Sequence, residues 1–139
     1  LNAQSLQQMA ISVVVNLVPP VPHDQAIQLI EGANILLIVQ PDTALQIPGK
    51  LFEYLAANKP VFALACQGAT QELVEAENIG LVVEPHDADA IKHALLHFIN
   101  AYKQCTLTTT YGSSDPLKYE SKNLTSQLVQ LFTRAIETP

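Results

Sequence analysis

Two oppositely charged side chains, Lys50 and Glu53, lie three residues apart where the sequence predicts the first turns of a helix. An ionised carboxylate can accept two hydroxyl donors at once. The first N–H groups of a helix have no partner within it and carry a partial positive charge, so those of Gly49 to Leu51, with the Lys50 amine, could hold a phosphate. By spacing alone, the sequence favours a simpler role for Glu53, a surface ion pair with Lys50 worth about 0.2–0.5 kcal/mol.

The residues that would position this pair form a loop, a helix, a tight turn and a buried strand. Pro48 suits the first turn of a helix, where no N–H is needed. Asn58 suits the left-handed position after a helix, and Pro60 prevents the helix from continuing. Residues 61–65 are all apolar, as in a parallel strand that is covered on both faces. The loop of residues 40–47 would then lie at the carboxyl end of a strand, where open α/β sheets bind ligands.

Strand and helix patterns alternate along the whole chain. The predicted strands cover residues 12–18, 34–39, 60–65 and 80–84. The predicted helices cover residues 24–31, 48–57, 70–78, 87–102 and 119–136, and a surface loop is predicted for residues 106–116. Hydrophobic residues make up 48% of the chain and charged residues 14%, which favours a doubly covered sheet. The sequence therefore predicts a single α/β domain over residues 1–139, a Rossmann-like parallel sheet with helices on both faces.

The stretch from Pro48 to Val61 resembles the helix and strand in the C-terminal domain of group 1 glycosyltransferases with the GT-B architecture. The matching residues are Pro48, Lys50, Leu51, Phe52, Glu53, Tyr54, Leu55, Ala56, Lys59, Pro60 and Val61. The resemblance extends from residue 11 to residue 136 but covers only the later part of that domain, because its early glycine-containing strand and helix are not found here. It implies a partial GT-B C-terminal domain, a fragment of a two-domain protein, whose closing helix packs back across the fold.

This resemblance implies the donor-binding part of a retaining glycosyltransferase, with a nucleotide diphosphate-sugar as the donor substrate. Glu53 would accept hydrogen bonds from the ribose hydroxyls, and Gly49, Lys50 and Leu51 would lie beside the diphosphate. No metal ion or other cofactor is expected. The acceptor would bind to the protein's own N-terminal domain, which is absent from this chain, so the chain alone is expected to transfer no sugar. A nucleotide-sugar epimerase of the same fold is an alternative function.

One position departs from the family pattern. Many members carry a glutamate eight residues before the ribose-binding one, in contact with the donor sugar, but here Leu45 occupies that position. Asp42 is the nearest acidic residue and is therefore included among the candidate donor-binding residues. This difference leaves the identity of the donor sugar more open than the membership of the family.

Charge and motif content argue against other classes of function. A net charge of −6, without a run of basic residues, argues against nucleic acid as a partner. No apolar stretch reaches the roughly 18 residues that span a membrane, so membrane association is expected only through parts outside this chain. The strand ends carry no acidic cluster, which disfavours a non-catalytic, receiver-like signalling module. The two cysteines, Cys66 and Cys105, are expected to be free thiols of a cytoplasmic protein.

Other polar residues are predicted to be solvated. His93 and His97 lie one helical turn apart, a spacing that suits a metal ion, but no third ligand is evident. Glu72, Glu75 and Glu77 are expected to lie on the exposed face of their helix.

Overall fold

Three parallel strands form a sheet in the computed structural model, which describes residues 14–112, 115 and 117–137. The strands are β1 (Leu36–Gln40), β2 (Val61–Ala65) and β3 (Gly80–Val83). Their order is β1-β2-β3, and the register pairs Ile38 with Ala63 and Ala63 with Val82. Both pairings are parallel, which confirms the prediction for the last three of the four expected strands.

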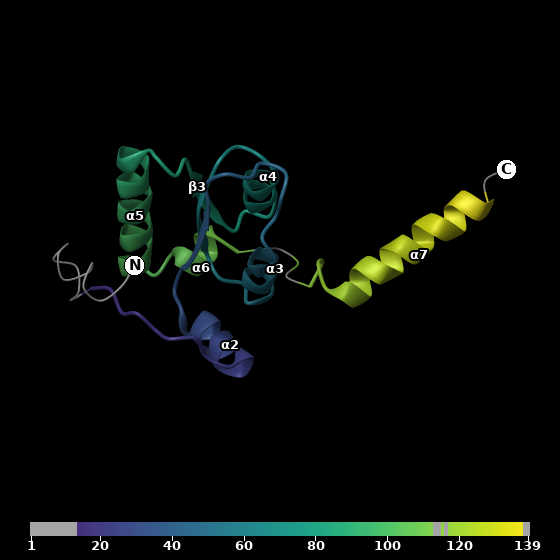
Figure 1. Ribbon diagram of the computed structural model, residues 1–139, viewed down its shortest axis with the longest axis horizontal. Helices are drawn as coiled ribbons and strands as arrows, with labels where there is room; N and C mark the ends of the chain where they lie inside the picture. The colour runs from purple at the N-terminus through teal and green to yellow at the C-terminus, as the bar shows by residue number, and fades with distance from the viewer. Residues whose placement is uncertain (1–13, 113–114, 116, 138–139) are drawn as a thin grey trace.

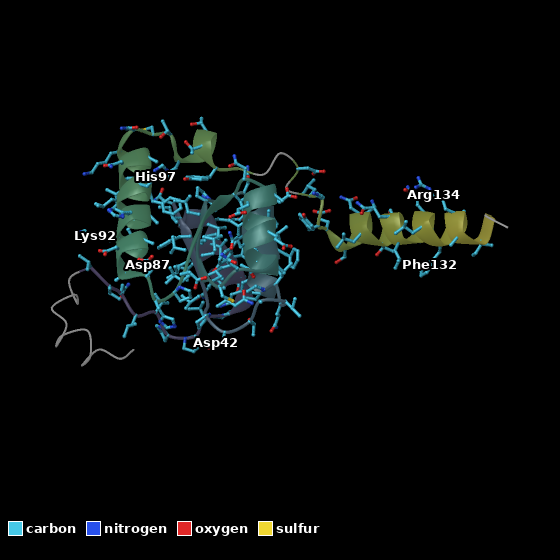
Figure 2. The ribbon with its side chains drawn as sticks, turned by 90° about the horizontal axis from the view of Figure 1, so that it is seen from above. Asp42, Asp87, Lys92, His97, Phe132 and Arg134 are labelled. Atoms are coloured by element: carbon cyan, nitrogen blue, oxygen red, sulfur yellow. The ribbon has the colours of Figure 1, made fainter. Side chains whose placement is uncertain are left out.

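Helices cover both faces of this sheet, as predicted. They are α2 (His23–Gly32), α3 (Gly49–Ala56), α4 (Ala69–Ala76), α5 (Ala88–Lys103), α6 (Leu107–Thr110) and α7 (Ser121–Glu137). Figure 1 shows α5 on one side of the strands and α3 with α4 on the other. Figure 2, in which His97 marks α5, shows the same arrangement from above. Within the described residues, no helix is long and apolar enough to cross a membrane.

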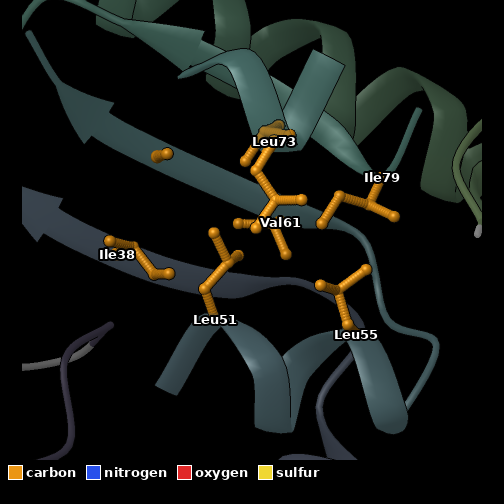
Figure 3. Close-up of a cluster of buried hydrophobic side chains, with 8 residues drawn as sticks. Ile38, Leu51, Leu55, Val61, Leu73 and Ile79 are labelled. Atoms are coloured by element: carbon orange, nitrogen blue, oxygen red, sulfur yellow. The ribbon is translucent and has the colours of Figure 1, made fainter. Parts of the chain in front are cut away.

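One hydrophobic core lies between the sheet and the helices α3 and α4. It contains the buried side chains of α3, the helix predicted to hold the ligand. Leu51 of α3 and Val61 of β2 are 0% exposed, and Leu55 is 1% exposed. Figure 3 shows them interdigitating with Ile38 of β1 and Leu73 of α4. Because these contacts fix one side of α3 against the sheet, they also fix the direction in which its polar side points.

A second, more aromatic core lies between the sheet and α5. Phe98 of α5 is 1% exposed, and its ring centroid lies 5.6 Å from that of Phe62 on β2 and 5.4 Å from that of Tyr111. Ala94 and Ala101 complete the buried side of α5 at helical spacing. The Asp87 carboxylate accepts a hydrogen bond of 2.9 Å from the N–H of Ala90, so Asp87 caps α5.

The predicted first strand is wrong for the part that the structure describes. Residues 14–18 are exposed and form no strand, and residues 12 and 13 lie outside the described residues. A β-branched composition fits a strand, but a strand is stable only where a neighbour pairs with it or covers it. The sheet of the described residues therefore has three strands rather than four.

The predicted loop of residues 106–116 is wrong in its first half, which contains the short helix α6. Leu107 and Tyr111 are each only 6% exposed and belong to the core beside α5. These two apolar residues are four positions apart, so a single helical turn brings both side chains to the same surface. The surrounding threonines obscured this pattern in the sequence.

The last helix forms as predicted but does not pack back across the fold. Figure 1 shows α7 projecting away from the sheet, and Figure 2 shows Phe132 on this projecting helix. Its apolar side chains are between 44% and 84% exposed: Leu124, Leu128, Val129, Leu131, Phe132 and Ile136. No other described element covers this side of α7, so the prediction that the closing helix packs across the fold is wrong for the described residues.

Glu77, predicted to be exposed, is buried. Only 8% of it is exposed, and its Oε1 atom lies 2.7 Å from the Lys118 amine and 2.8 Å from the Tyr119 hydroxyl, both of which donate to it. Tyr119 also packs its ring on Phe52 of α3, with 5.6 Å between ring centroids. A buried carboxylate is retained because charged and polar partners replace its water. These contacts attach the segment before α7 to the rest of the chain.

Candidate functional site

The N-terminus of α3 presents backbone N–H groups that no side chain caps. Pro48 precedes the helix with φ −61° and ψ 133°, and it makes no side-chain capping hydrogen bond. The N–H of Leu51 already donates to the carbonyl of Pro48 at 2.9 Å. The N–H groups of Gly49 and Lys50 are therefore the ones that can meet an anion, while Leu51 contributes by burying its side chain beneath them.

The two charged residues of α3 are both exposed and do not pair with each other. Neither Glu53 nor Lys50 makes an ion pair or a side-chain hydrogen bond with another described residue. The surface ion pair that the spacing favours is thus not formed, and the carboxylate keeps all of its acceptor capacity. Burial, and next the Glu53 carboxylate, raise the pKa of Tyr54 above its usual value of 10.0. The phenol therefore remains neutral at physiological pH and adds no second negative charge beside Glu53.

Glu53 lines a groove of about 270 Å³ between α3 and α2. The residues that line it are His23, Ile27, Ile30, Glu31, Glu53, Ala56 and Ala57. Its floor is mostly apolar, with one imidazole and two carboxylates placed around it. Such a mixture suits a ligand with one flat apolar part and several hydroxyl groups.

The contribution of α2 to this groove was missed in the sequence. His23, Ile27 and Glu31 recur at intervals of four, so they lie along one side of α2. That periodicity is visible in the sequence, but it does not say which helix lies opposite. The pairing of α2 with α3 is a tertiary feature, and only the structure shows it.

The loop before α3 carries the remaining candidate residue, Asp42, which Figure 2 places at the edge of the sheet region. Asp42 is exposed and does not line the groove with Glu53. Leu45, which stands where the family has its first glutamate, is 95% exposed. The structure therefore groups Gly49, Lys50 and Glu53 on α3 and leaves Asp42 on the neighbouring loop.

This loop is held in place by the start of α4. The N–H of Ala69 donates to the carbonyl of Ala44 at 2.7 Å. Gly68 has φ 151° and ψ −158°, and a Cβ atom at this position would lie 2.1 Å from the Ala44 carbonyl oxygen. Only glycine allows the two backbones to approach this closely.

The two histidines at metal-binding spacing do not form a metal site. The Nε2 atom of His97 lies 2.9 Å from the Tyr111 hydroxyl, at the rim of the core beside α5. Across the part of the chain that the structure describes, no three histidine, cysteine, aspartate or glutamate side chains gather as metal ligands would. Cys66 and Cys105 are free thiols, as predicted.

Comparison with known proteins agrees with this architecture. The family model "Glycosyl transferases group 1" matches residues 2–101, and no curated protein matches the sequence. Among solved structures, sucrose-phosphate synthase from Thermosynechococcus elongatus matches with a TM-score of 0.72 at 20% sequence identity. The match covers 98% of this chain and 34% of that chain, so the chain spans about a third of the length of its structural relative. The family match confirms the resemblance inferred from the residues around Glu53: the chain belongs to the group 1 glycosyltransferases.

Proposed function

We propose that this chain binds the nucleotide diphosphate part of a nucleotide-sugar donor in a retaining glycosyltransferase. The observation that carries the proposal is the Glu53 carboxylate, which pairs with no other described residue, lines a groove and lies on the same short helix as the N–H groups of Gly49 and Lys50. Hydroxyl donors and phosphate oxygens, the two kinds of group in a ribose diphosphate, would each find a matching partner there.

The groups are spaced as this ligand requires. Glu53 follows Gly49 by four residues, which is just over one helical turn or roughly 6 Å along the axis. A diphosphate at the helix N-terminus therefore leaves the attached ribose beside the carboxylate. The apolar groove floor made by Ile27 and Ala57 would then take the face of the base.

The residues of α3 would contribute to sugar transfer by stabilising the leaving group. Negative charge grows on the diphosphate as the bond to the sugar breaks, and donors fixed in advance stabilise such charge. The Lys50 amine and the helix N-terminus supply this stabilisation without a metal ion. The acceptor and the groups that contact it belong to a second domain in this proposal, because the chain spans only about a third of its structural relative.

Replacing Glu53 by glutamine tests the proposal. A hydrogen bond to a charged group contributes about 1.5–3 kcal/mol, so binding of the nucleoside diphosphate is expected to weaken roughly tenfold or more. Titration calorimetry of the full-length protein with UDP, ADP and GDP in turn measures the change. Stability should remain nearly unaltered because the carboxylate is exposed and has no partner in the part of the chain that the structure describes.

Glu75→Gln is the matched control, since Glu75 is an exposed glutamate on α4 that does not line the groove. It should bind the diphosphates like the wild-type protein. Equal affinities for wild type and Glu53→Gln would show that Glu53 is an ordinary surface residue. A parallel loss of affinity and melting temperature would give it a structural role instead.

A further inference from the structure

A buried amide at the end of β1 is not explained by the packing of the core. Gln40, the last residue of the strand, is 8% exposed, and its neighbour Thr70 in the first turn of α4 is 2% exposed. Burying two polar side chains costs free energy unless each of their polar atoms finds a partner. In this structure they find those partners in each other and in the loop that precedes α3.

The hydrogen bonds of this amide fix its orientation. The Oε1 atom of Gln40 accepts from the Thr70 hydroxyl at 2.6 Å. Its Nε2 atom lies 2.5 Å from the carbonyl oxygen of Gln46 and 2.6 Å and 3.2 Å from the hydroxyl and carbonyl oxygens of Thr43. Turning the amide over would place an oxygen against two carbonyl oxygens, which cannot donate, so the orientation shown is the one that satisfies every group.

These contacts connect three elements across the loop of residues 41–47. The Thr70 hydroxyl, whose proton is directed to Gln40, also lies 3.2 Å from the Gln46 carbonyl oxygen, so side chains of β1 and α4 both contact the same loop atom. Gln46 is three residues before Gly49, the first residue of α3. The side chains of residues 41–46 are exposed, and within the loop of residues 41–47 it is Ile47, at its end, that packs against the core beside α3. Before Ile47, the path of the loop depends on the amide and the hydroxyl together with the Ala69–Ala44 hydrogen bond.

We propose that Gln40 and Thr70 are positioning residues that hold the loop of residues 41–47 and the first N–H groups of α3 in the arrangement that binds the diphosphate. This inference rests on the proposed function of α3. The inference predicts different effects on the diphosphate and on the nucleoside of the ligand. Glu53 and the groove lie further along α3, and the buried side chains of this helix hold them in place.

Thr70→Val tests the inference, because valine keeps the volume of threonine and removes its hydroxyl. The Oε1 atom of Gln40 then loses its donor, so a buried acceptor is left unsatisfied and the side chain of α4 no longer helps to hold the amide. In the full-length protein, affinity for the tightest-binding of UDP, ADP and GDP should fall about fivefold to tenfold. Affinity for the corresponding nucleoside, measured by competition, should change less than twofold, since the nucleoside makes no contact at the helix N-terminus.

Two further variants serve as controls. Thr109→Val removes an exposed hydroxyl from α6 that donates to the Thr106 carbonyl at 2.9 Å, and it should leave both affinities unchanged. Thr70→Ser restores a hydroxyl at the buried position and should recover most of the diphosphate affinity. The melting temperature of each variant shows how much of any loss comes from general destabilisation.

The outcomes separate the inference from the proposed function. If the wild-type protein binds the diphosphate and Thr70→Val binds it equally well, the positioning role is wrong and the proposed function stands. An equal loss of diphosphate and nucleoside affinity would also overturn the positioning role, since it shows a general structural effect. If the wild-type protein binds none of the three diphosphates, the proposed function fails and the inference fails with it.

Discussion

Phe98→Ala is expected to lower the free energy of unfolding by about 3–5 kcal/mol, because it removes a buried aromatic side chain from the core between the sheet and α5. Phe98 is 1% exposed and packs between Phe62 and Tyr111. Phe62 belongs to the middle strand of the sheet and Tyr111 to the segment after α6, so neither can move far to fill the cavity. Urea unfolding followed by tyrosine fluorescence measures the change.

Leu95→Ala is the matched control on the same helix. Leu95 is 45% exposed, and truncating an exposed side chain away from such packing changes the free energy of unfolding by about 0.5 kcal/mol or less. The difference between the two variants therefore reports burial rather than helix propensity, since both replace a residue of α5 with alanine. Comparable losses in the two variants would contradict the position of Phe98 in the aromatic core.

Gly68→Ala is expected to displace the loop of residues 41–47 and to destabilise the fold. The backbone conformation at Gly68, with φ 151°, costs a side-chain-bearing residue about 1–3 kcal/mol. The added Cβ would also lie 2.1 Å from the Ala44 carbonyl oxygen, so the loop must move and the Ala69–Ala44 hydrogen bond must lengthen. Urea unfolding should show the loss of stability, and calorimetry with the diphosphate should show a drop of at least tenfold in affinity.

Gly32→Ala is the control for a glycine-to-alanine exchange. Gly32 is the last residue of α2, and a Cβ atom there would meet nothing within 4 Å. The exchange should be tolerated without loss of stability or binding. If Gly68→Ala behaved in the same way, the close approach of the two backbones would not be required.

The elements around α3 could be predicted because their signals are local. Asn58 has the expected left-handed φ of 50°, Pro60 separates helix from strand, and residues 61–65 form β2 with the expected bounds. In each case the residue acts on its own backbone or on the next turn, so the order of residues is enough to identify the structure. Gly49 and Lys50 were selected for a similar local reason, because they begin a helix, whereas the ligand role of Glu53 came from the family resemblance, since its spacing alone favours an ion pair with Lys50.

The features that could not be predicted depend on residues far apart in the chain. Glu77 is buried because Lys118 and Tyr119, more than forty residues later, reach its carboxylate. The groove at Glu53 depends on α2, and the buried amide of Gln40 depends on Thr70. A pattern read along the sequence gives the side of a helix that is apolar, but it does not identify what covers that side.

The projection of α7 determines what an unfolding experiment on this chain reports. A helix of 17 residues with exposed side chains is only marginally stable by itself in water. Far-ultraviolet circular dichroism would then record the fraying of α7 and the cooperative melting of the sheet in one signal. The van't Hoff enthalpy from such a curve would fall below the calorimetric enthalpy, although the sheet with α3, α4 and α5 melts in a single step. Tyrosine fluorescence avoids this mixture because α7 contains no tyrosine.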